Sequence, residues 1–191
     1  MTATTKYQKP APEITGWMGD DELQWLFELG TRGGRPGIVV EVGCWFGRST
    51  HALASSGALV YAVDHFHGSP TELEGAHAFA KTGNVKAEFD KNMGQRKNMR
   101  VMAMDSTTAA RQFAPKGVDA VFIDGEHTLE ACLTDLRSWA PKVKVGGLLC
   151  GHDRDQSGVP VALKEFFGFP PRTVVGSIWA MEKTEEGWRE L

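Results

Sequence analysis

The chain has 191 residues and a formal net charge of −3 at pH 7, with 21 basic and 24 acidic side chains. A chain of this length fits one domain that buries about 70% of its unfolded surface, which is enough for a complete α/β core. It lacks the basic excess that phosphate backbones select for, and no apolar run approaches the ~20 residues of a membrane span. We therefore expect neither nucleic acid nor a membrane as a partner.

The cysteines and the N-terminal residues favour a cytoplasmic protein. Three cysteines stand far apart, at positions 44, 132 and 150, and none belongs to a CxxC pair. An odd and scattered set disfavours both a disulfide framework and a zinc finger. The N-terminus also lacks the charged head and apolar stretch of a signal peptide.

Residues 1–18 are polar and contain two prolines. We expect them to form a flexible arm that docks through Ile14 and Trp17. Residues 19–191 are expected to form a single domain.

Within that domain, a helix capped by Asp20 or Asp21 and ended by Gly30 comes first. Strand and helix patterns then alternate. Strand patterns lie near 37–43, 58–63, 99–104, 118–124 and 145–151. Helical patterns lie near 47–56, 71–94, 106–114, 128–140 and 159–167, and one or two edge strands lie within 172–181. Alternation with near-continuous apolar strands predicts a doubly wound α/β fold, with a mostly parallel sheet and an antiparallel C-terminal edge.

Two glycines and an acid mark the end of the first strand, in the run Val39-Val-Glu-Val-Gly-Cys-Trp-Phe-Gly-Arg-Ser-Thr50. Gly43 and Gly47 allow a sharp turn close to a ligand, and the N–H groups of the following helix face the same place. The dinucleotide fingerprint G-x-G-x-x-G would need glycines where Trp45 and Arg48 stand, and no P-loop occurs. The turn suits a nucleoside cofactor with a positive, phosphate-free centre and leaves an NAD-type oxidoreductase as a distant alternative.

Polar side chains follow the predicted parallel strands, at the edge where open α/β sheets bind their ligands. These residues are Glu41, Asp64, Asp105 with Ser106, Asp124 with His127, and His152 with Asp153. Each acid alone is more often a helix cap or a solvated charge, but five such positions on one edge indicate a site. Asp64 follows the glycine turn by about twenty residues, where a carboxylate can accept hydrogen bonds from both ribose hydroxyls.

In this order and spacing, the motifs resemble those of class I S-adenosylmethionine-dependent methyltransferases. They lie at 41–50, 60–64, 104–106, 122–127 and 146–153. The resemblance covers Ile14 to Lys183 and is to the small branch related to macrocin-type O-methyltransferases and cephalosporin-hydroxylase-like proteins. It implies a Rossmann-like methyltransferase fold with S-adenosylmethionine as the cofactor.

The resemblance also implies a cofactor-binding set of Glu41, Gly43, Gly47, Ser49, Asp64, Asp105, Ser106 and Asp124. Ser49 would bond the cofactor carboxylate, Asp64 would hold the ribose hydroxyls, and Asp105 with Ser106 would lie at the adenine edge. Two plain structural alternatives are open, with Ser49 as a helix-start residue and Asp105 as a helix N-cap.

A divalent cation, Mg²⁺ or Mn²⁺, is implied at Asp124, His152 and Asp153, with His127 and Asp124 as the catalytic residues. His152 departs from the family pattern, because relatives often have Glu or Asp there. Imidazole suits Mn, Zn, Fe, Ni or Cu better than Mg, so the use and the identity of a metal are open. The alternative role of His152 is a hydrogen bond to the substrate or to a ligand residue.

The expected activity is O-methylation of a hydroxylated small molecule or sugar, with the cation lowering the hydroxyl pKa and His127 accepting the proton. A non-catalytic S-adenosylmethionine-binding protein or subunit is the alternative. The acceptor would contact Trp45, Phe46 and Trp179.

Selectivity for the acceptor would come from the arm, from the 65–98 insertion acting as a lid, from the 154–158 loop, or from the second subunit of a homodimer. Within the insertion, His65 and His67 have a metal-like spacing. A contact with the substrate is the reading we prefer for them.

Overall fold

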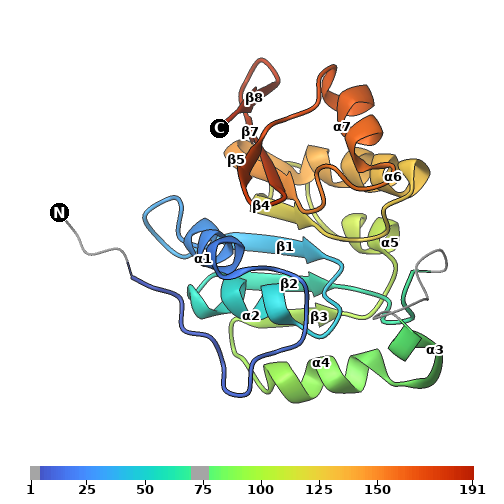
Figure 1. Cartoon of the computed structure of the whole chain (residues 1–191). Coiled ribbons are helices and arrows are strands. Elements are labelled where there is room, and N and C mark those ends of the chain that lie inside the picture. Colours follow the sequence, from blue (N-terminus) through green and yellow to red (C-terminus); the bar gives the residue numbers. More distant parts are fainter. Residues whose placement is uncertain (1–4, 70–77) are drawn as a thin grey trace.

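The computed structural model describes residues 5–69 and 78–191, and these form one mixed sheet with helices on both faces (Figure 1). Five strands are parallel: β1 (Ile38–Val42), β2 (Leu59–Val63), β3 (Met99–Met102), β4 (Val118–Ile123) and β5 (Val143–Gly151). The antiparallel edge consists of β6 (Thr173–Val175), β7 (Ile178–Lys183) and β8 (Trp188–Glu190). The strand order is β3-β2-β1-β4-β5-β7-β6, with β8 paired to β7. The predicted mostly parallel sheet with an antiparallel C-terminal edge is confirmed.

The helices form two layers. One face of the sheet carries α1 (Asp20–Leu29), α2 (Arg48–Ser55) and α4 (Val85–Met93). The other carries α5 (Ser106–Ala110), α6 (Leu129–Trp139) and α7 (Val159–Phe167). Shorter helices lie at α3 (Phe79–Thr82) and at the 3₁₀ turn Ala140–Lys142. No helix in the described ranges is long and apolar enough to cross a bilayer.

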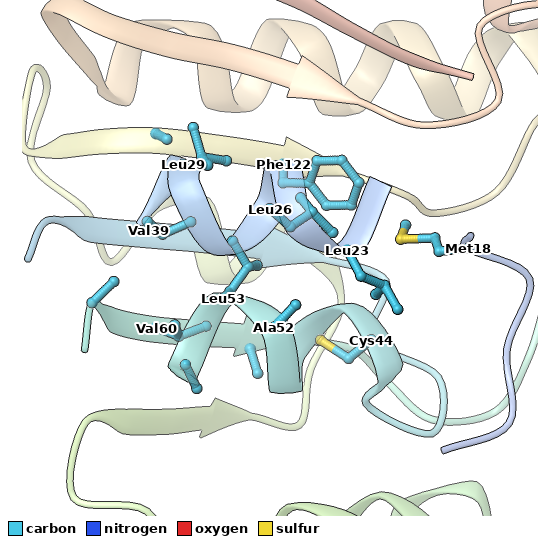
Figure 2. Packing of buried hydrophobic residues seen from close by; sticks show 14 of the residues in the cluster. Met18, Leu23, Leu26, Leu29, Val39, Cys44, Ala52, Leu53, Val60 and Phe122 are labelled. Atoms are coloured by element: carbon cyan, nitrogen blue, oxygen red, sulfur yellow. The ribbon is translucent and has the colours of Figure 1, made fainter. Parts of the chain in front are cut away.

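Both faces of the parallel strands are buried, which explains their continuous apolar runs. Val39 and Val40 on β1 are fully buried, but Val39 belongs to the core under α1 and α2, and Val40 to the core under α5 and α6. Figure 2 shows the first core, in which Leu23 and Leu26 of α1 and Leu53 of α2 lie over the sheet. The sheet and its helices therefore hold the strand ends in fixed positions.

Two helices differ from the prediction. The described part of the helix predicted at 71–94 contains α3 and α4, separated at Gly83, while residues 70–77 lie outside the described chain. Asn84 starts α4 anew, because its side chain accepts a hydrogen bond from the N–H of Ala87 at 2.9 Å. The helix predicted at 106–114 already ends at Ala110, after which the N–H groups of Gln112 and Phe113 bond carbonyl oxygens three residues back, as in a tightened last turn.

The N-cap of α1 is Gly19 and not Asp20 or Asp21. Asp20 is already the first helical residue, and the N–H of Gly19 donates to the carboxylate of Glu22 at 2.8 Å. Glu22 thus supplies the side-chain half of a capping box, in which an acid three residues into the helix bonds the N-cap backbone.

The described part of the N-terminal arm packs along α1 and α2. Ile14 is buried as expected, whereas Trp17 is 57% exposed. The Tyr7 hydroxyl and Nδ1 of His51 are hydrogen-bonded at 2.8 Å, and Arg48 donates to two carbonyl oxygens of the arm. The exposed ring of Trp17 is therefore left on the surface beside the carboxyl ends of the strands.

Candidate functional site

A cavity of about 400 Å³ opens where the carboxyl ends of β1, β2, β4 and β5 meet. This is the edge at which the sheet topology predicts a ligand. The sequence-predicted residues that line it are Gly43, Ser49, Asp64, Ser106, Asp124, His127, His152 and Asp153. Three predicted cofactor residues, Glu41, Gly47 and Asp105, are not among the lining residues.

The turn after β1 brings its backbone very close to the end of β4. Gly43 has a φ of 85°, and a Cβ there would lie 2.1 Å from the carbonyl oxygen of Asp124. Trp45 also has a positive φ, 46°, at a position where a dinucleotide turn would have glycine. Gly47 precedes α2 at φ 91° and leaves space for the side chain of Met93. A left-handed tryptophan in this turn is a strained conformation of the kind that clusters at ligand sites.

Asp64 fixes this turn from the end of β2. Its Oδ2 accepts hydrogen bonds from the N–H groups of Cys44 at 2.8 Å and Trp45 at 3.0 Å, and its Oδ1 accepts one from Phe66 at 2.6 Å. A carboxylate can accept about four hydrogen bonds. Asp64 therefore has room for a ligand hydroxyl, but most of its capacity already holds the backbone of the turn.

Glu41 lies beneath the cavity and not on its wall. It is fully buried, and neither carboxylate oxygen has a hydrogen-bond partner within the described chain. Burial raises the pKa of Glu41 to about 7, while the nearby Ser49 and Thr50 hydroxyls act in the opposite direction. A positive charge in the cavity would favour the ionised form of this acid.

Asp105 and Ser106, the two residues predicted at the adenine edge, take different roles in the structure. Asp105 is the N-cap of α5, accepting hydrogen bonds from Thr108 N at 3.2 Å and from the Thr107 and Thr108 hydroxyls at 2.9 Å. Ser106 does line the cavity, and its hydroxyl accepts a hydrogen bond from Trp139 Nε1 at 2.8 Å. The helix-cap alternative for Asp105 is the one that the structure shows.

Asp135 on α6 is a cavity residue that the sequence analysis missed. Burial raises its pKa to about 6, although a hydrogen bond from Ser106 acts against this. A buried acid within an amphipathic helix has no pattern that separates it from an exposed one. Only its placement beside Ser106 at the cavity wall reveals it.

Asp124, His127, His152 and Asp153 converge on the β4 and β5 side of the cavity. His127 Nε2 lies 2.8 Å from Asp153 Oδ2, and His152 Nδ1 lies 3.1 Å from the same oxygen and 3.7 Å from Asp124 Oδ1. Asp153 has a φ of 54°, a left-handed conformation uncommon outside glycine. Ligand atoms of Asp124, His152 and Asp153 all lie within 4.8 Å of one another, so this predicted metal set is brought together.

The charges of this cluster are strongly coupled. Burial raises the pKa of Asp124 to about 6, with His152 acting in the opposite direction. Burial alone would lower the pKa of His152, but the Asp153 hydrogen bond and the Asp124 carboxylate raise it to about 9. Burial would also raise the pKa of Asp153, but hydrogen bonds from His127 and His152 hold it far below its usual range. The cluster has the negative charge and the mixed O and N donors that a divalent cation requires.

Glu22 is a second residue of the site that the sequence analysis missed. Its Oε1 lies 3.1 Å from Nε2 of His152 and accepts a hydrogen bond from the N–H of Ser177 at 2.9 Å. The Ser177 hydroxyl lies 2.8 Å from the same ring nitrogen. Glu22 and His152 are 130 positions apart, so no local pattern could join them.

Of the aromatic and histidine residues predicted to contact the acceptor, some line the cavity and others do not. Trp45 and Phe46 line the cavity together with Trp17, whereas Trp179 is buried in the core under α6 and α7 and does not reach the cavity wall. Its large ring packs against apolar neighbours, as most tryptophans do. The ring centroids of His65 and His67 lie 5.6 Å apart, but only His65 lines the cavity and so is placed for the predicted substrate contact. Neither belongs to the group of described residues that could hold a metal ion.

The fold and the cavity define an α/β protein with a ligand-sized cavity at the carboxyl edge of its sheet and an acid and histidine cluster beside it. Residues 40–154, more than half of the chain, match the family model described as "Methyltransferase domain". The chain belongs to this family of methyltransferases. The predicted class, S-adenosylmethionine-dependent methyltransferases of class I, is confirmed, and the macrocin-type branch stays a prediction.

Solved structures show the same fold. The O-methyltransferase NovP matches with a TM-score of 0.61 and 18% identity, over 86% of this chain and 79% of NovP. CalS11, a TDP-rhamnose 3′-O-methyltransferase of calicheamicin biosynthesis, matches with a TM-score of 0.58 and 17% identity, over 85% and 79% of the two chains. A precorrin-8w decarboxylase from Methanobacterium thermoautotrophicum matches at 0.57 and 18%, over 100% and 94%. Because these proteins differ in named activity, the fold alone does not define the reaction.

Proposed function

We propose that the chain transfers the methyl group of S-adenosylmethionine to a hydroxyl oxygen of a small molecule. One observation carries this proposal. The same cavity joins the glycine turn and Asp64, on its β2 side, to Asp124, His127 and Asp153, on its β5 side. A cofactor and a proton acceptor would therefore lie next to each other along one edge of the sheet.

The cofactor would lie across the turn with its ribose at Asp64 and its carboxylate at Ser49, where the N-terminus of α2 favours an anion. Its adenine would lie between Ser106 and Asp135. The sulfonium centre carries a positive charge, which suits the acids Glu41 and Asp124 below and beside the turn. None of these residues supplies the extended phosphate cradle that a dinucleotide needs.

Methyl transfer requires little from the protein beyond alignment and proton removal, because the sulfonium methyl is already electrophilic. A bond forms between the acceptor oxygen and the methyl carbon while the bond from carbon to sulfur breaks, giving S-adenosylhomocysteine and an ether. The hydroxyl proton passes to His127. Asp153 Oδ2 lies 2.8 Å from Nε2 of this ring, so this carboxylate would stabilise the positive charge that His127 gains with the proton.

The residues present fit a divalent cation. Two carboxylates, Asp124 and Asp153, and the Nδ1 atom of His152 would hold it, and the imidazole favours Mn²⁺ over Mg²⁺. When bound, the cation would lower the pKa of an acceptor hydroxyl and neutralise the oxyanion.

The acceptor would be a ring compound with free hydroxyls, such as a sugar or a natural-product glycoside. Support comes from the aromatic wall, which we define as Trp17, Trp45 and Phe46, on the rim of the cavity. The rings of Trp45 and Phe46 stack at 4.7 Å, and that of Trp17 lies 6.1 Å from Trp45. Aromatic faces of this kind bind apolar ring surfaces while polar groups fix the orientation.

The test is formation of S-adenosylhomocysteine and an O-methylated product from S-adenosylmethionine, Mn²⁺ and a panel of hydroxylated glycosides and phenols. We expect His127→Ala to lower kcat by about 10²–10⁴-fold, as loss of a general base does. His67→Ala is the matched control, because His67 is an exposed histidine outside the cavity wall. Full turnover by both His127→Ala and Asp124→Ala would contradict the proposal.

A further inference from the structure

We propose that Glu22 is a positioning residue of this site, and the inference deepens the function proposed above. From the first turn of α1, its carboxylate fixes the His152 ring so that Nε2 faces α1 and Nδ1 faces Asp124 and Asp153. The two ring nitrogens would thus have separate tasks.

The contacts of Glu22 divide between its two oxygens. Oε2 accepts the hydrogen bond from the N–H of Gly19 at 2.8 Å, which ties the carboxylate to the start of α1. Oε1 lies 3.1 Å from Nε2 of His152 and accepts from Ser177 N at 2.9 Å and from Ser177 Oγ at 3.3 Å. Only 8% of Glu22 is exposed, so its charge is held by these partners and not by water.

The helix that carries Glu22 is firmly placed. Leu23 and Leu26, which follow it on α1, are 1% and 0% exposed in the core under α1 and α2 (Figure 2). A side chain anchored on a packed helix holds its partner more precisely than one on a loop. The position of the His152 ring is therefore set by the packing of α1 on the sheet.

The turn between β6 and β7 is shaped around the same carboxylate. Gly176 has a φ of 51°, and a Cβ at this position would lie only 2.2 Å from Oε1 of Glu22. The glycine thus gives the carboxylate access to the N–H of Ser177. This feature is independent of the helix cap, since it lies in a turn distant in sequence and involves the other oxygen of the carboxylate.

A carboxylate on one ring nitrogen of histidine has a known physical effect on the other. It fixes the plane of the ring and keeps a proton on the nitrogen it bonds, so that a cation can take the place of the proton on the second nitrogen. In this chain the second nitrogen is Nδ1, which lies 3.1 Å from Asp153 Oδ2 and 3.7 Å from Asp124 Oδ1. Glu22 would therefore act on the cation site through His152 without touching the cation.

The test compares Glu22→Gln with Asp21→Asn, which removes the same charge from the same helical turn at an exposed residue. Mn²⁺ affinity is measured by electron paramagnetic resonance, S-adenosylhomocysteine affinity by calorimetry, and the His152 ring N–H by proton NMR of ¹⁵N-histidine-labelled protein. We expect Glu22→Gln to weaken Mn²⁺ binding by about 10–100-fold, the usual effect of losing such a partner. S-adenosylhomocysteine affinity should stay within about twofold, and Asp21→Asn should behave as wild type. The His152 N–H signal should move upfield in Glu22→Gln, because the acceptors left at Nε2, the amide oxygen and the Ser177 hydroxyl at 2.8 Å, carry no charge.

A second variant tests the inference in case Glu22→Gln does not fold. Glu22→Asp keeps the charge in the first turn but is one methylene too short to bond Gly19 and His152 together, so it should weaken Mn²⁺ binding to a similar extent. Wild-type Mn²⁺ affinity in both folded variants, together with an unshifted N–H signal in Glu22→Gln, would overturn the inference. If the wild-type protein itself binds no Mn²⁺, the cation part of the proposed function fails, and the N–H signal alone decides the role of Glu22. An upfield shift of the signal in Glu22→Gln then supports the inference, and an unshifted signal overturns it.

Discussion

Gly43 and Asp124 meet backbone to backbone, so closely that a Cβ on Gly43 would stand 2.1 Å from the Asp124 carbonyl oxygen. The two residues end neighbouring parallel strands, and the N–H of Asp124 also donates to the carbonyl of Val42 at 2.8 Å. The proposed cofactor turn and the proposed catalytic acid are thus parts of one backbone contact. A substitution at Gly43 should therefore also disturb the position of Asp124.

Gly43→Ala should lower both stability and cofactor affinity. The added methyl group meets backbone atoms that cannot rotate away, at a φ of 85° that L-residues rarely adopt. We expect a loss of about 2–4 kcal/mol in the free energy of unfolding and at least a tenfold weaker binding of S-adenosylhomocysteine. Urea unfolding and calorimetry measure the two effects.

The control for this variant is Gly168→Ala. Gly168 has nearly the same φ, 84°, but a Cβ there would meet nothing within 4 Å. The free energy of unfolding of Gly168→Ala should fall by only about 1 kcal/mol, the cost of the left-handed conformation, and the ligand affinity should not change. Equal losses in the two variants would show that strain, and not the contact with Asp124, dominates.

Asp64→Asn should weaken S-adenosylhomocysteine binding by about tenfold or more. The amide can offer a single acceptor oxygen where the carboxylate holds Cys44, Trp45 and Phe66 with two. Asp105→Asn should leave the affinity unchanged, because Asp105 caps α5 and asparagine caps about as well. Calorimetry on the two variants shows which of the two acids contributes to cofactor binding. A loss of affinity in Asp105→Asn would support the predicted position of Asp105 at the adenine edge.

Trp17→Ala should raise the KM for the acceptor by about fivefold or more, in line with the loss of about 1 kcal/mol of ring contact. Stability should not change, since the side chain is already 57% exposed. The measurement is steady-state kinetics with the acceptor found by product screening, and the S-adenosylhomocysteine affinity is the internal control. A change in cofactor affinity with an unchanged KM would assign the aromatic wall to the cofactor instead.

The buried pair of Tyr7 and His51 should make stability depend on pH. Burial lowers the pKa of His51 to about 4, and the charge of Arg96 acts in the same direction. The unfolded chain has a histidine pKa near 6.5, so it binds a proton that the folded chain refuses as the pH falls. The contribution of His51 is therefore complete above about pH 6.5 and is lost progressively toward about pH 4.

His51→Gln isolates this effect from the titration of the carboxylates. Glutamine can still accept the hydrogen bond from the Tyr7 hydroxyl but carries no charge. Between about pH 7 and pH 4.5, wild type should lose about 2 kcal/mol more of its free energy of unfolding than the variant does. Parallel curves for the two proteins in urea unfolding would mean that the folded state accommodates the protonated ring.

The fold was predictable because its signals are local. Val39 and Val40 lie in a continuous apolar run, and such a run, alternating with helix patterns, has few solutions other than a parallel sheet covered on both faces. The break at Gly83 was not predicted, because the helical pattern continues on both sides of it and the cap at Asn84 is a single side-chain contact.

The site was predictable as far as it follows strand ends. The sequence predicted that Asp124, His152 and Asp153 share one edge of the sheet, and they come together there because β4 and β5 are neighbours. Glu22 was missed because it reaches the site from a helix 130 positions away. Asp105 was predicted to contact the cofactor because no sequence feature distinguishes a helix cap from a ligand contact. In the structure it accepts hydrogen bonds from Thr107 and Thr108 and caps α5.

The most direct test of the account is calorimetric titration of S-adenosylhomocysteine into wild type, Gly43→Ala and Asp64→Asn. We predict one site per chain with a Kd in the micromolar range for wild type, a binding free energy of about −8 kcal/mol, and at least tenfold weaker binding to both variants. NAD should give no saturable heat. Absence of binding by wild type at high micromolar ligand, or equal binding by all three proteins, would contradict the assignment of this cavity to S-adenosylmethionine.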